Sequence, residues 1–340
     1  MGPKGFAGVE SAPRPSVAEE GSADVKAVFK RLMGWAAAAV TFAGAATAAL
    51  AGEADLHNWQ LGFQSSVTEV MDDITWFNNM TLVIITLVTL FVLALLIWVM
   101  VRYNAKSNPV PSRTSHNTMI EIAWTVAPIL ILVVIAIPSF RLLYKQLEIP
   151  EYDMTVKAIG YQWYWGYEYT DENMSGLYFD SFMVGDARDS AADTQARQQF
   201  ADERGVTLNE VPRLLAVTHD MVVPVDTTVR LQVTAADVIH AFAMPAMGLK
   251  IDAIPGRLNE TWFHAREEGI YYGQCSELCG DLHAFMPIAI RVVSQEQYDQ
   301  WAALAPQDVD AANQQLMAAI AADKKVAALE ETGENNVAAN

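Results

Sequence analysis

Two long runs of apolar residues constrain the fold of this chain more than any other feature of its sequence. Met80 to Val101 is a run of 22 residues without a charge, and Ile122 to Phe140 is a run of 19. Since a helix rises about 1.5 Å per residue, each run is long enough to cross a hydrocarbon core about 30 Å thick. Pro128 inside the second run and Pro138 near its end are tolerated where neighbouring helices satisfy the freed carbonyl groups. We therefore expect a hairpin of two membrane-spanning helices within residues 80–146.

The charges around these runs indicate the orientation of the hairpin. The connector, residues 102–119, holds three basic residues and no acidic residue, whereas three acidic residues lie shortly before the first run. Connectors rich in Lys and Arg remain in the cytoplasm. This predicts a cytoplasmic connector, with residues 52–79 and everything after Phe140 outside the cell membrane, in the periplasm.

A shorter apolar run near the N-terminus, Gly34 to Ala51, follows three basic residues and ends in Ala49-Leu50-Ala51. A basic flank, a short apolar centre and small residues at the end are typical of a secretory signal peptide. We expect residues 1–51 to be a leader that is cleaved after Ala51. The alternative is a further membrane helix.

After the hairpin the sequence changes to short apolar alternations separated by Asp, Gly, Pro and Asn. These short segments without helical periods predict an all-β sandwich over residues 147–294. We expect a polar insertion, residues 183–212, to be a surface loop of this domain. Residues 295–340 are expected to form a helix and then a mobile tail. The predicted strands are Met154 to Ile159, Gln162 to Tyr169, Leu214 to Thr218, Thr228 to Val233, Thr261 to Ala265 and Pro287 to Val293.

The formal net charge of −18 limits the possible partners of the outer domain. Between Tyr144 and Ser294, 22 Asp and Glu residues stand against 11 Lys and Arg residues. This balance excludes nucleic acid as a partner. It favours a basic protein, because opposite fields increase association rates. The alternative explanation is the solubility of an exported domain.

The two cysteines of the chain lie together in the stretch CSELCGDLHAFM, which begins at Cys275. In an oxidising compartment, a disulfide between Cys275 and Cys279 is the first interpretation. However, His283 and Met286 follow at once, and thiolate, imidazole and thioether are donors that copper selects. Two thiolates can bridge two copper ions, each of which then needs its own imidazole. Among the six histidines the best second candidate is His240, which ends a strand-like run.

These residues resemble the binuclear copper A motif of the cytochrome c oxidase subunit II family. The motif is Asp-x-x-His, followed 35 residues later by Cys-Ser-Glu-Leu-Cys-Gly-x-x-His-x-x-Met, and the resemblance runs from Asn58 to about Val293. It implies a cupredoxin-like Greek-key sandwich after the hairpin, in a bacterial inner membrane. It also implies a subunit that accepts electrons from cytochrome c and passes them to haem in subunit I, for O2 reduction coupled to proton pumping.

The resemblance implies a role for each residue of the copper site. Cys275 and Cys279 would be bridging thiolates, and His240 and His283 would each bind one of two copper ions. Met286 and the backbone carbonyl of Glu277 would be weak axial donors. The Glu277 carboxylate would reach a magnesium ion shared with subunit I, and carboxylates suit that cation.

Further roles follow from the same resemblance. Trp163, in an aromatic row predicted for alternate residues from Tyr161 to Tyr169, corresponds to the point where electrons enter from cytochrome c; the alternative is core packing. Three acidic residues, Glu168, Asp180 and Asp237, correspond to the positions that receive the basic rim of cytochrome c. Glu121, with His116 nearby, corresponds to the mouth of a proton pathway at the cytoplasmic end of the second span.

Three other protein classes share parts of this pattern. The homologous quinol oxidase subunit has the same fold but lacks the Cys, His and Met set. The presence of all five side chains argues against an exported sensor with a disulfide or a copper-delivery protein, although a copper chaperone would expose such ligands too. A nitrous-oxide reductase would need a further histidine-rich domain, which six histidines cannot supply. The sequence therefore favours the oxidase subunit. Because it has no Cys-x-x-Cys-His haem site, we expect the electron donor to be a separate protein.

Overall fold

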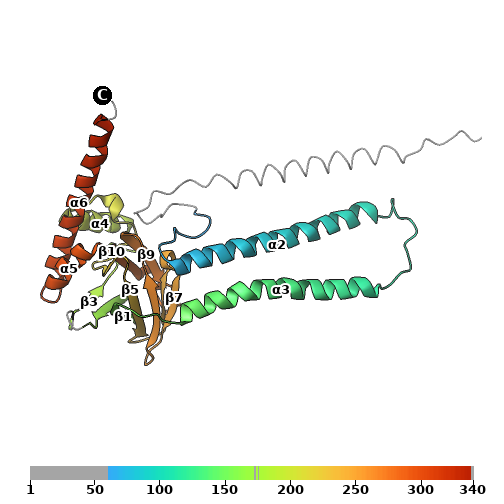
Figure 1. Cartoon of the computed structure of the whole chain (residues 1–340), viewed down its shortest axis with the longest axis horizontal. Helices are drawn as coiled ribbons and strands as arrows, with labels where there is room; N and C mark the ends of the chain where they lie inside the picture. Colours follow the sequence, from blue (N-terminus) through green and yellow to red (C-terminus); the bar gives the residue numbers. More distant parts are fainter. Residues whose placement is uncertain (1–59, 172–173, 175, 338–340) are drawn as a thin grey trace, which may run out of the picture. The chain divides into compact units, whose positions relative to one another are not determined.

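A computed structural model of the chain describes residues 60–171, 174 and 176–337 (Figure 1). The predicted leader, residues 1–51, and the first part of the outer segment 52–79 lie outside the described residues. The remaining residues form a helical hairpin, a β-sandwich and three further α-helices, α4, α5 and α6.

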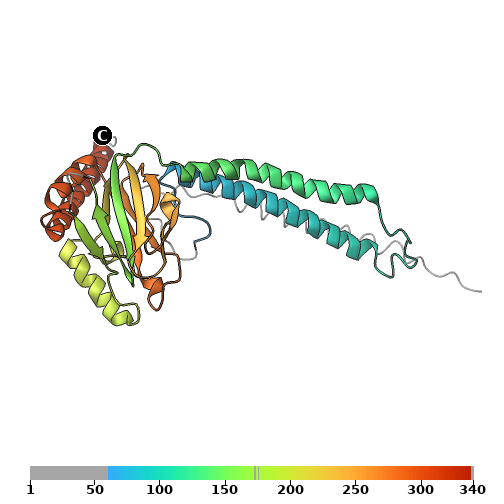
Figure 2. The ribbon, with the colours of Figure 1, turned by 90° about the horizontal axis from the view of Figure 1, so that it is seen from below.

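The hairpin consists of α2 (Glu69–Arg102) and α3 (Thr118–Leu147), which run side by side in Figures 1 and 2. Thr68 caps α2 by accepting a hydrogen bond from the Met71 amide, and Asn117 caps α3 through the amides of Met119 and Ile120. The most apolar 18-residue stretch of α2 has a mean hydropathy of 3.1, and that of α3 has a mean hydropathy of 2.5. No residue of these two stretches is buried within the chain. Helices that are apolar all round require lipid or another apolar partner.

The first helix begins earlier than the apolar run alone indicated. Residues 69–79, expected to belong to the outer segment, form the first turns of α2. The reason is the cap at Thr68, which is also bonded through its hydroxyl to the carbonyl of Met247 at 2.9 Å. Backbone bonding between Val67 and Ala246 fixes the same junction, so that the start of α2 is tied to the β-domain.

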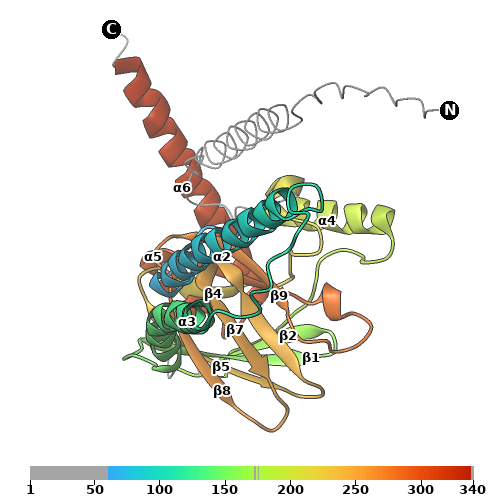
Figure 3. The ribbon, with the colours of Figure 1, turned by 90° about the vertical axis from the view of Figure 1, so that its right-hand side faces the viewer.

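The β-domain contains two five-stranded sheets (Figure 3). One sheet has the order β3-β2-β1-β5-β8, and the other has the order β4-β10-β9-β6-β7. The pairs β1–β5 and β10–β4 are parallel, and all other pairs are antiparallel. The predicted cupredoxin-like sandwich is confirmed. Its strands are β1 (Met154–Tyr161), β2 (Tyr164–Tyr169), β3 (Tyr178–Ser181), β4 (Met221–Pro224), β5 (Thr228–Ala235), β6 (His240–Met244), β7 (Leu249–Ala253), β8 (Asn259–His264), β9 (Gly269–Cys275) and β10 (Pro287–Val293).

The core lies between the two sheets and follows the alternation of the strands. Along β5 every second residue is buried, and the four inward residues are Val229, Leu231, Val233 and Ala235. Tyr169 on β2 crosses the core, because its hydroxyl accepts from the Val222 amide and donates to the Val222 carbonyl. Burial of these apolar side chains supplies the main stabilisation of the sandwich.

The aromatic row predicted for Tyr161 to Tyr169 is only partly formed. Trp165, Tyr167 and Tyr169 are buried on one face of β2. Trp163, in contrast, lies in the turn between β1 and β2, and Tyr161 is in β1, where it pairs with Tyr164. The prediction of one continuous strand was wrong here because the chain reverses direction at residues 162–163.

The insertion is more ordered than expected. Residues predicted as a surface loop form α4 (Ser190–Arg204) and the short 3-10 helix η2 (Leu208–Glu210), and a small core of Val184, Ala201, Val211 and Ala216 holds them. The predicted strand Leu214 to Thr218 makes only an isolated bridge, between Met183 and Val217.

The predicted helix at the start of the tail is present as α5 (Gln295–Leu304). It is followed by a second helix, α6 (Val309–Val337), within the segment that was expected to be a mobile tail. Ala312 and Leu316 of α6 are buried in the main core, and the Trp301 indole donates to Asn313 across the two helices at 2.9 Å. Figure 2 shows α4, α5 and α6 beside the sandwich.

Candidate metal centre

The residues of the copper motif come from two neighbouring strands and the loop that follows them. His240 is the first residue of β6 and Cys275 is the last residue of β9, and these strands are antiparallel partners. The β9–β10 loop carries Cys279, His283 and Met286. Backbone hydrogen bonds hold both ends of the segment 275–286. The Ser276 amide donates to the Ala241 carbonyl at 2.9 Å, and the Cys275 amide donates to the Met286 carbonyl at 3.3 Å.

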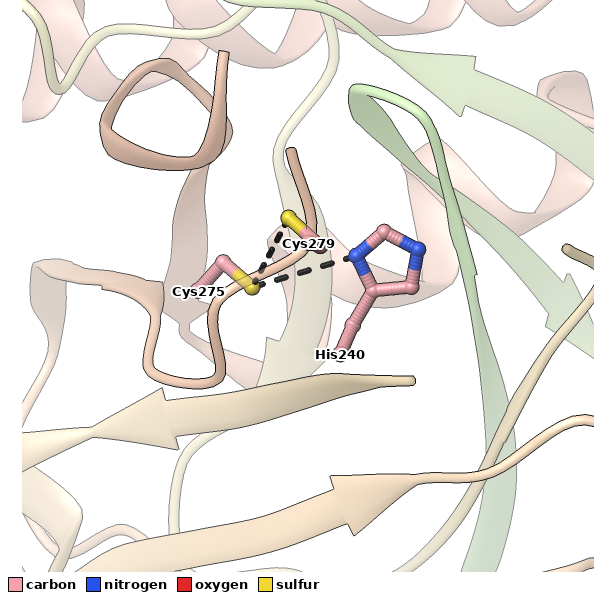
Figure 4. Close-up of side chains that lie close together, drawn as sticks. All are labelled: His240, Cys275 and Cys279. Atoms are coloured by element: carbon pink, nitrogen blue, oxygen red, sulfur yellow. Dashed lines mark hydrogen bonds between the residues drawn. The ribbon is translucent and has the colours of Figure 1, made fainter. Parts of the chain in front are cut away.

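This arrangement brings all five predicted side-chain donors together. Figure 4 shows three of them, His240, Cys275 and Cys279. The sulfur atoms of Cys275 and Cys279 are 3.9 Å apart, and both cysteines are free. Nδ1 of His240 lies 3.9 Å from the Cys275 sulfur, and Nδ1 of His283 lies 3.6 Å from the Cys279 sulfur. The thiol pair therefore has an imidazole at each end.

Two weaker donors complete the cluster. The Met286 sulfur lies 3.5 Å from the Cys279 sulfur, and the Glu277 carbonyl oxygen lies 3.4 Å from the Cys275 sulfur. Donors around a tetrahedral ion with bonds of about 2.2 Å are separated by about 3.6 Å. The observed spacings of 3.4–3.9 Å match this value, and the donors are of the soft kind that suits copper. The residues present thus fit a copper centre.

The environment of His240 fixes which nitrogen faces the thiols. The ring is fully buried, and its Nε2 lies 2.9 Å from Oδ1 of Asp237. Because a carboxylate only accepts hydrogen bonds, Nε2 carries a proton and Nδ1 is directed toward Cys275. Gly160 permits this packing, since a Cβ atom there would come within 2.8 Å of the ring.

The thiols differ in their acidity. Burial opposes ionisation of Cys275, but hydrogen bonds with His240, with the backbone at Glu277 and Ala241, and with His283 together outweigh it and lower the pKa of this thiol to about 6. Burial, and then the adjacent Cys275, raise the pKa of the Cys279 thiol to about 12. Burial likewise opposes a charged His240, yet Cys275 and Asp237 together raise the pKa of its imidazole. One thiolate is therefore favoured in the metal-free site at neutral pH.

The turn that contains Trp163 is bonded directly to the ligand loop. The Cys279 carbonyl accepts from the Trp163 indole at 3.2 Å and from the Gln162 amide side chain at 2.8 Å. Gly280 lets the turn approach, because a Cβ atom there would lie 3.0 Å from the indole. The Gln162 backbone amide also donates to Asp237 at 2.7 Å. Sequence reasoning missed this contribution of Gln162, and a turn between two predicted strands offered little signal for it.

Comparison with known proteins matches two families along the chain. Residues 56–142 match the transmembrane domain of cytochrome c oxidase subunit II, and residues 154–293 match its periplasmic domain. A "Probable cytochrome c oxidase subunit 2" of Rickettsia bellii is 49% identical over 245 residues, covering 72% of this chain and 84% of that protein.

The chain belongs to the cytochrome c oxidase subunit II family.

Other members of the subunit II family show comparable similarity. The cytochrome c oxidase subunit 2 of Cereibacter sphaeroides is 50% identical over 243 residues, covering 71% of this chain and 78% of that protein. A crystal structure of the periplasmic domain of subunit II from Bradyrhizobium japonicum is 49% identical and covers 48% of this chain and 99% of that domain, with a TM-score of 0.39.

Membership in the subunit II family confirms the main expectations from the sequence. The chain is a subunit of an oxidoreductase complex and a membrane protein with two spans. The family carries a copper A centre, and the clustered Cys and His residues are the candidate ligands in this subunit II.

The three acidic residues predicted to dock cytochrome c occupy different settings in this subunit II. Asp237 is bonded to the turn of Trp163 and to His240. Glu168 on β2 forms an ion pair with Lys157 at 2.9 Å. Asp180 on β3 accepts a hydrogen bond from the Tyr178 hydroxyl at 2.6 Å. Only Asp237 therefore contacts the candidate copper site.

The remaining predicted residues lie in two places. Glu277 is exposed on the ligand loop, between the two cysteines. Glu121 is in the first turn of α3, where it is half-buried, and His116 is exposed just before that helix. These two residues are at the connector end of the hairpin and do not join the copper ligands.

Proposed function

We propose that this subunit accepts electrons from a reduced c-type cytochrome at a binuclear copper centre and passes them to haem in subunit I of the oxidase. The observation that carries the proposal is the buried pair of free thiols with an imidazole at each end, in direct contact with the turn of Trp163. A copper-free quinol oxidase subunit would have no use for this set of donors.

The ligands in this proposal are the residues that the loop brings together. Cys275 and Cys279 would bridge the metals, His240 and His283 would each bind one, and Met286 and the Glu277 carbonyl would be weak axial donors. When bound, two copper ions held by both thiolates would supply one-electron transfer with little reorganisation. The chain contributes rigidity, because β6, β9 and the start of β10 hold the ligand segments by backbone bonds.

Several side chains of the chain prepare the site before metal binds. Asp237 keeps the proton of His240 on Nε2 and so leaves Nδ1 free as a donor. Burial of Cys275, Cys279 and Met286 excludes water from the donors. The low pKa of the Cys275 thiol supplies one thiolate at neutral pH.

Trp163 is the proposed point of electron acceptance. Its indole is only partly buried, so that a docked protein can reach it, and one hydrogen bond joins it to the backbone of Cys279. Glu168, Asp180 and Asp237 would surround a docked basic cytochrome, and the acidic outer domain would steer its approach. This arrangement supports a protein donor and no nucleic-acid partner.

Three further roles belong to the same proposal. The exposed Glu277 carboxylate would hold a magnesium ion jointly with subunit I. Glu121, with His116, would stand at the start of a proton pathway on the cytoplasmic side. The basic connector would remain in the cytoplasm of a bacterial inner membrane, and both ends of the hairpin would face the periplasm.

The direct test mixes the copper-loaded full chain in detergent with a reduced c-type cytochrome in a stopped-flow instrument. We expect oxidation of the cytochrome to be coupled to reduction of the copper centre, with a rate that falls as salt is added. The matched control is the Cys279→Ser chain, which should bind the cytochrome but take up no electron. Absence of electron transfer to the loaded wild-type chain would contradict the proposal.

A further inference from the structure

His219 lies outside the copper site, between the C-terminal helix and a strand of the sandwich. Its ring stands between Asp310, in the first turn of α6, and the backbone of Asp180 on β3. The His219 side chain is 19% exposed, and the Asp310 side chain is 78% exposed. The imidazole is therefore a contact between two elements that are 130 residues apart in the sequence.

Both ring nitrogens of His219 face oxygen atoms that can only accept. Nδ1 lies 2.8 Å from the Asp180 carbonyl oxygen, and Nε2 lies 3.1 Å from Oδ1 of Asp310. A neutral imidazole carries one N–H group and can satisfy only one of these acceptors; the other nitrogen would then turn a lone pair toward an oxygen. The imidazolium form carries two N–H groups and satisfies both.

We propose that protonated His219 and Asp310 form a contact, the latch, that holds the start of α6 on the sandwich. Docking of the C-terminal helix would then weaken as the pH rises. Only the protonated ring satisfies both acceptors, so linkage would make protons favour docking. Histidine is the side chain that ordinarily titrates between pH 5 and 8.

Other charged groups lie around His219, and most of them have partners of their own. The Asp180 carboxylate is engaged by the Tyr178 hydroxyl, and Asp220 forms an ion pair with Arg291 at 2.7 Å. Arg204, at the end of α4, donates to the Thr218 carbonyl and lies in the field of Asp220 and Asp310. Asp180 and Asp220 thus have partners of their own. The Arg204 guanidinium keeps its charge, so a protonated His219 shares the field of Asp310 with Arg204.

The latch acts on only one part of the helix. Ala312 and Leu316 remain in the core, and Asn313 is bonded to Trp301, so the helix has apolar anchors that do not depend on pH. Figure 3 shows α6 continuing past the sandwich. Loss of the proton should therefore loosen the first turns of α6 without releasing the whole helix.

Hydrogen–deuterium exchange of the full chain in detergent tests the proposal. Protection factors, corrected for the intrinsic pH dependence of exchange, are measured at pH 6 and pH 8 for residues 309–316 and for β5 as an internal reference. We expect the protection factors of residues 309–316 to fall by about two- to fivefold at pH 8. A change of this size corresponds to the stabilisation that a partly exposed charge pair typically contributes. Protection in β5 should not change.

Two variants distinguish the latch from a general pH effect. In Asp310→Asn, the side-chain amide can donate to a neutral imidazole or accept from a protonated one, so the pH dependence of residues 309–316 should disappear. Asp252→Asn removes one charge on β7, at the sheet edge opposite β4, and should keep the wild-type pH dependence. Equal protection at both pH values in the wild type, or an unchanged pH dependence in Asp310→Asn, would overturn the proposal.

Discussion

Nε2 of His240 lies 2.9 Å from Oδ1 of Asp237, and the same carboxylate accepts the backbone amide of Gln162 at 2.7 Å. One side chain thus orients a candidate copper ligand and holds the turn that carries Trp163. Partners of this kind, which do not touch the metal themselves, fix the tautomer and orientation of ligand imidazoles. Asp237 therefore has a role in positioning His240 and the turn of Trp163, in addition to its predicted role in docking cytochrome c.

Replacing Asp237 with Asn should weaken copper binding. Loss of the carboxylate frees the His240 tautomer, and partners of ligand imidazoles typically contribute about 10- to 100-fold to metal affinity. The measurement is a competition titration of the full chain with a copper chelator. Glu168→Gln is the charge-matched control, because Glu168 bonds to Lys157 and not to the site. Equal copper affinities in both variants would show that Asp237 acts only through surface charge.

Replacing Trp163 with Phe should slow electron acceptance while leaving the copper spectrum unchanged. Phe keeps an aromatic ring but cannot donate to the Cys279 carbonyl, which retains its bond from Gln162. Stopped-flow mixing with a reduced c-type cytochrome measures the rate. Gln162→Ala, which removes the other bond to the same carbonyl, is the control for loop disturbance and should slow the reaction less. Loss of the copper spectrum in Trp163→Phe would instead assign the indole to packing of the loop.

The two thiols of the metal-free chain should react differently with an alkylating agent. The thiolate is the reactive form, so alkylation of Cys275, whose pKa is lowered to about 6, should fall as the pH drops through that value and level off above it. Cys279, whose pKa is raised to about 12, should react slowly throughout the range from pH 5 to 9. Mass spectrometry of peptides after timed iodoacetamide treatment separates the sites. Parallel titration of both thiols near pH 8.5 would argue against the observed contact with His240.

The stability of the sandwich should depend on the pair of Arg291 and Asp220. Asp220 is 5% exposed and is bonded to Arg291 at 2.7 Å, so Arg291→Leu would leave a buried carboxylate without its partner. Breaking such a pair typically costs about 3–5 kcal/mol in the free energy of unfolding. Denaturant titration followed by tryptophan fluorescence measures this change. Lys324→Leu, which breaks a more exposed pair with Glu210, should cost less than about 1 kcal/mol.

The sequence predicted those parts of the molecule that depend on local pattern. Long charge-free runs required membrane helices, and the spacing of Cys275, Cys279, His283 and Met286 within one loop required that these donors lie close together. His240, which lies 35 residues before Cys275, could be placed beside them because few histidines were available. The expectation that it ends a strand was wrong, since it is the first residue of β6. The pairing of β6 with β9 supplies the physical reason for that proximity.

Features that depend on tertiary contacts could not be predicted in the same way. The reversal at residues 162–163 interrupts an aromatic pattern that would suit one long strand, and its bonds to Cys279 and Asp237 form only in the folded protein. The insertion has few apolar residues, yet Ala201 of α4 and Val211 join Val184 and Ala216 in a small core. Short strands such as β3 and β4, with four residues each, carry too little alternation to be recognised.

Copper stoichiometry and electron paramagnetic resonance of the loaded full chain test the central claim most directly. We predict two copper ions per chain and, after one-electron oxidation of the reduced centre, a spectrum in which a single unpaired electron is shared by both ions. Cys279→Ser should lose this shared signal. One copper ion per chain with a single-ion spectrum, or a colourless chain that holds a Cys275–Cys279 disulfide, would contradict the assignment of a binuclear centre.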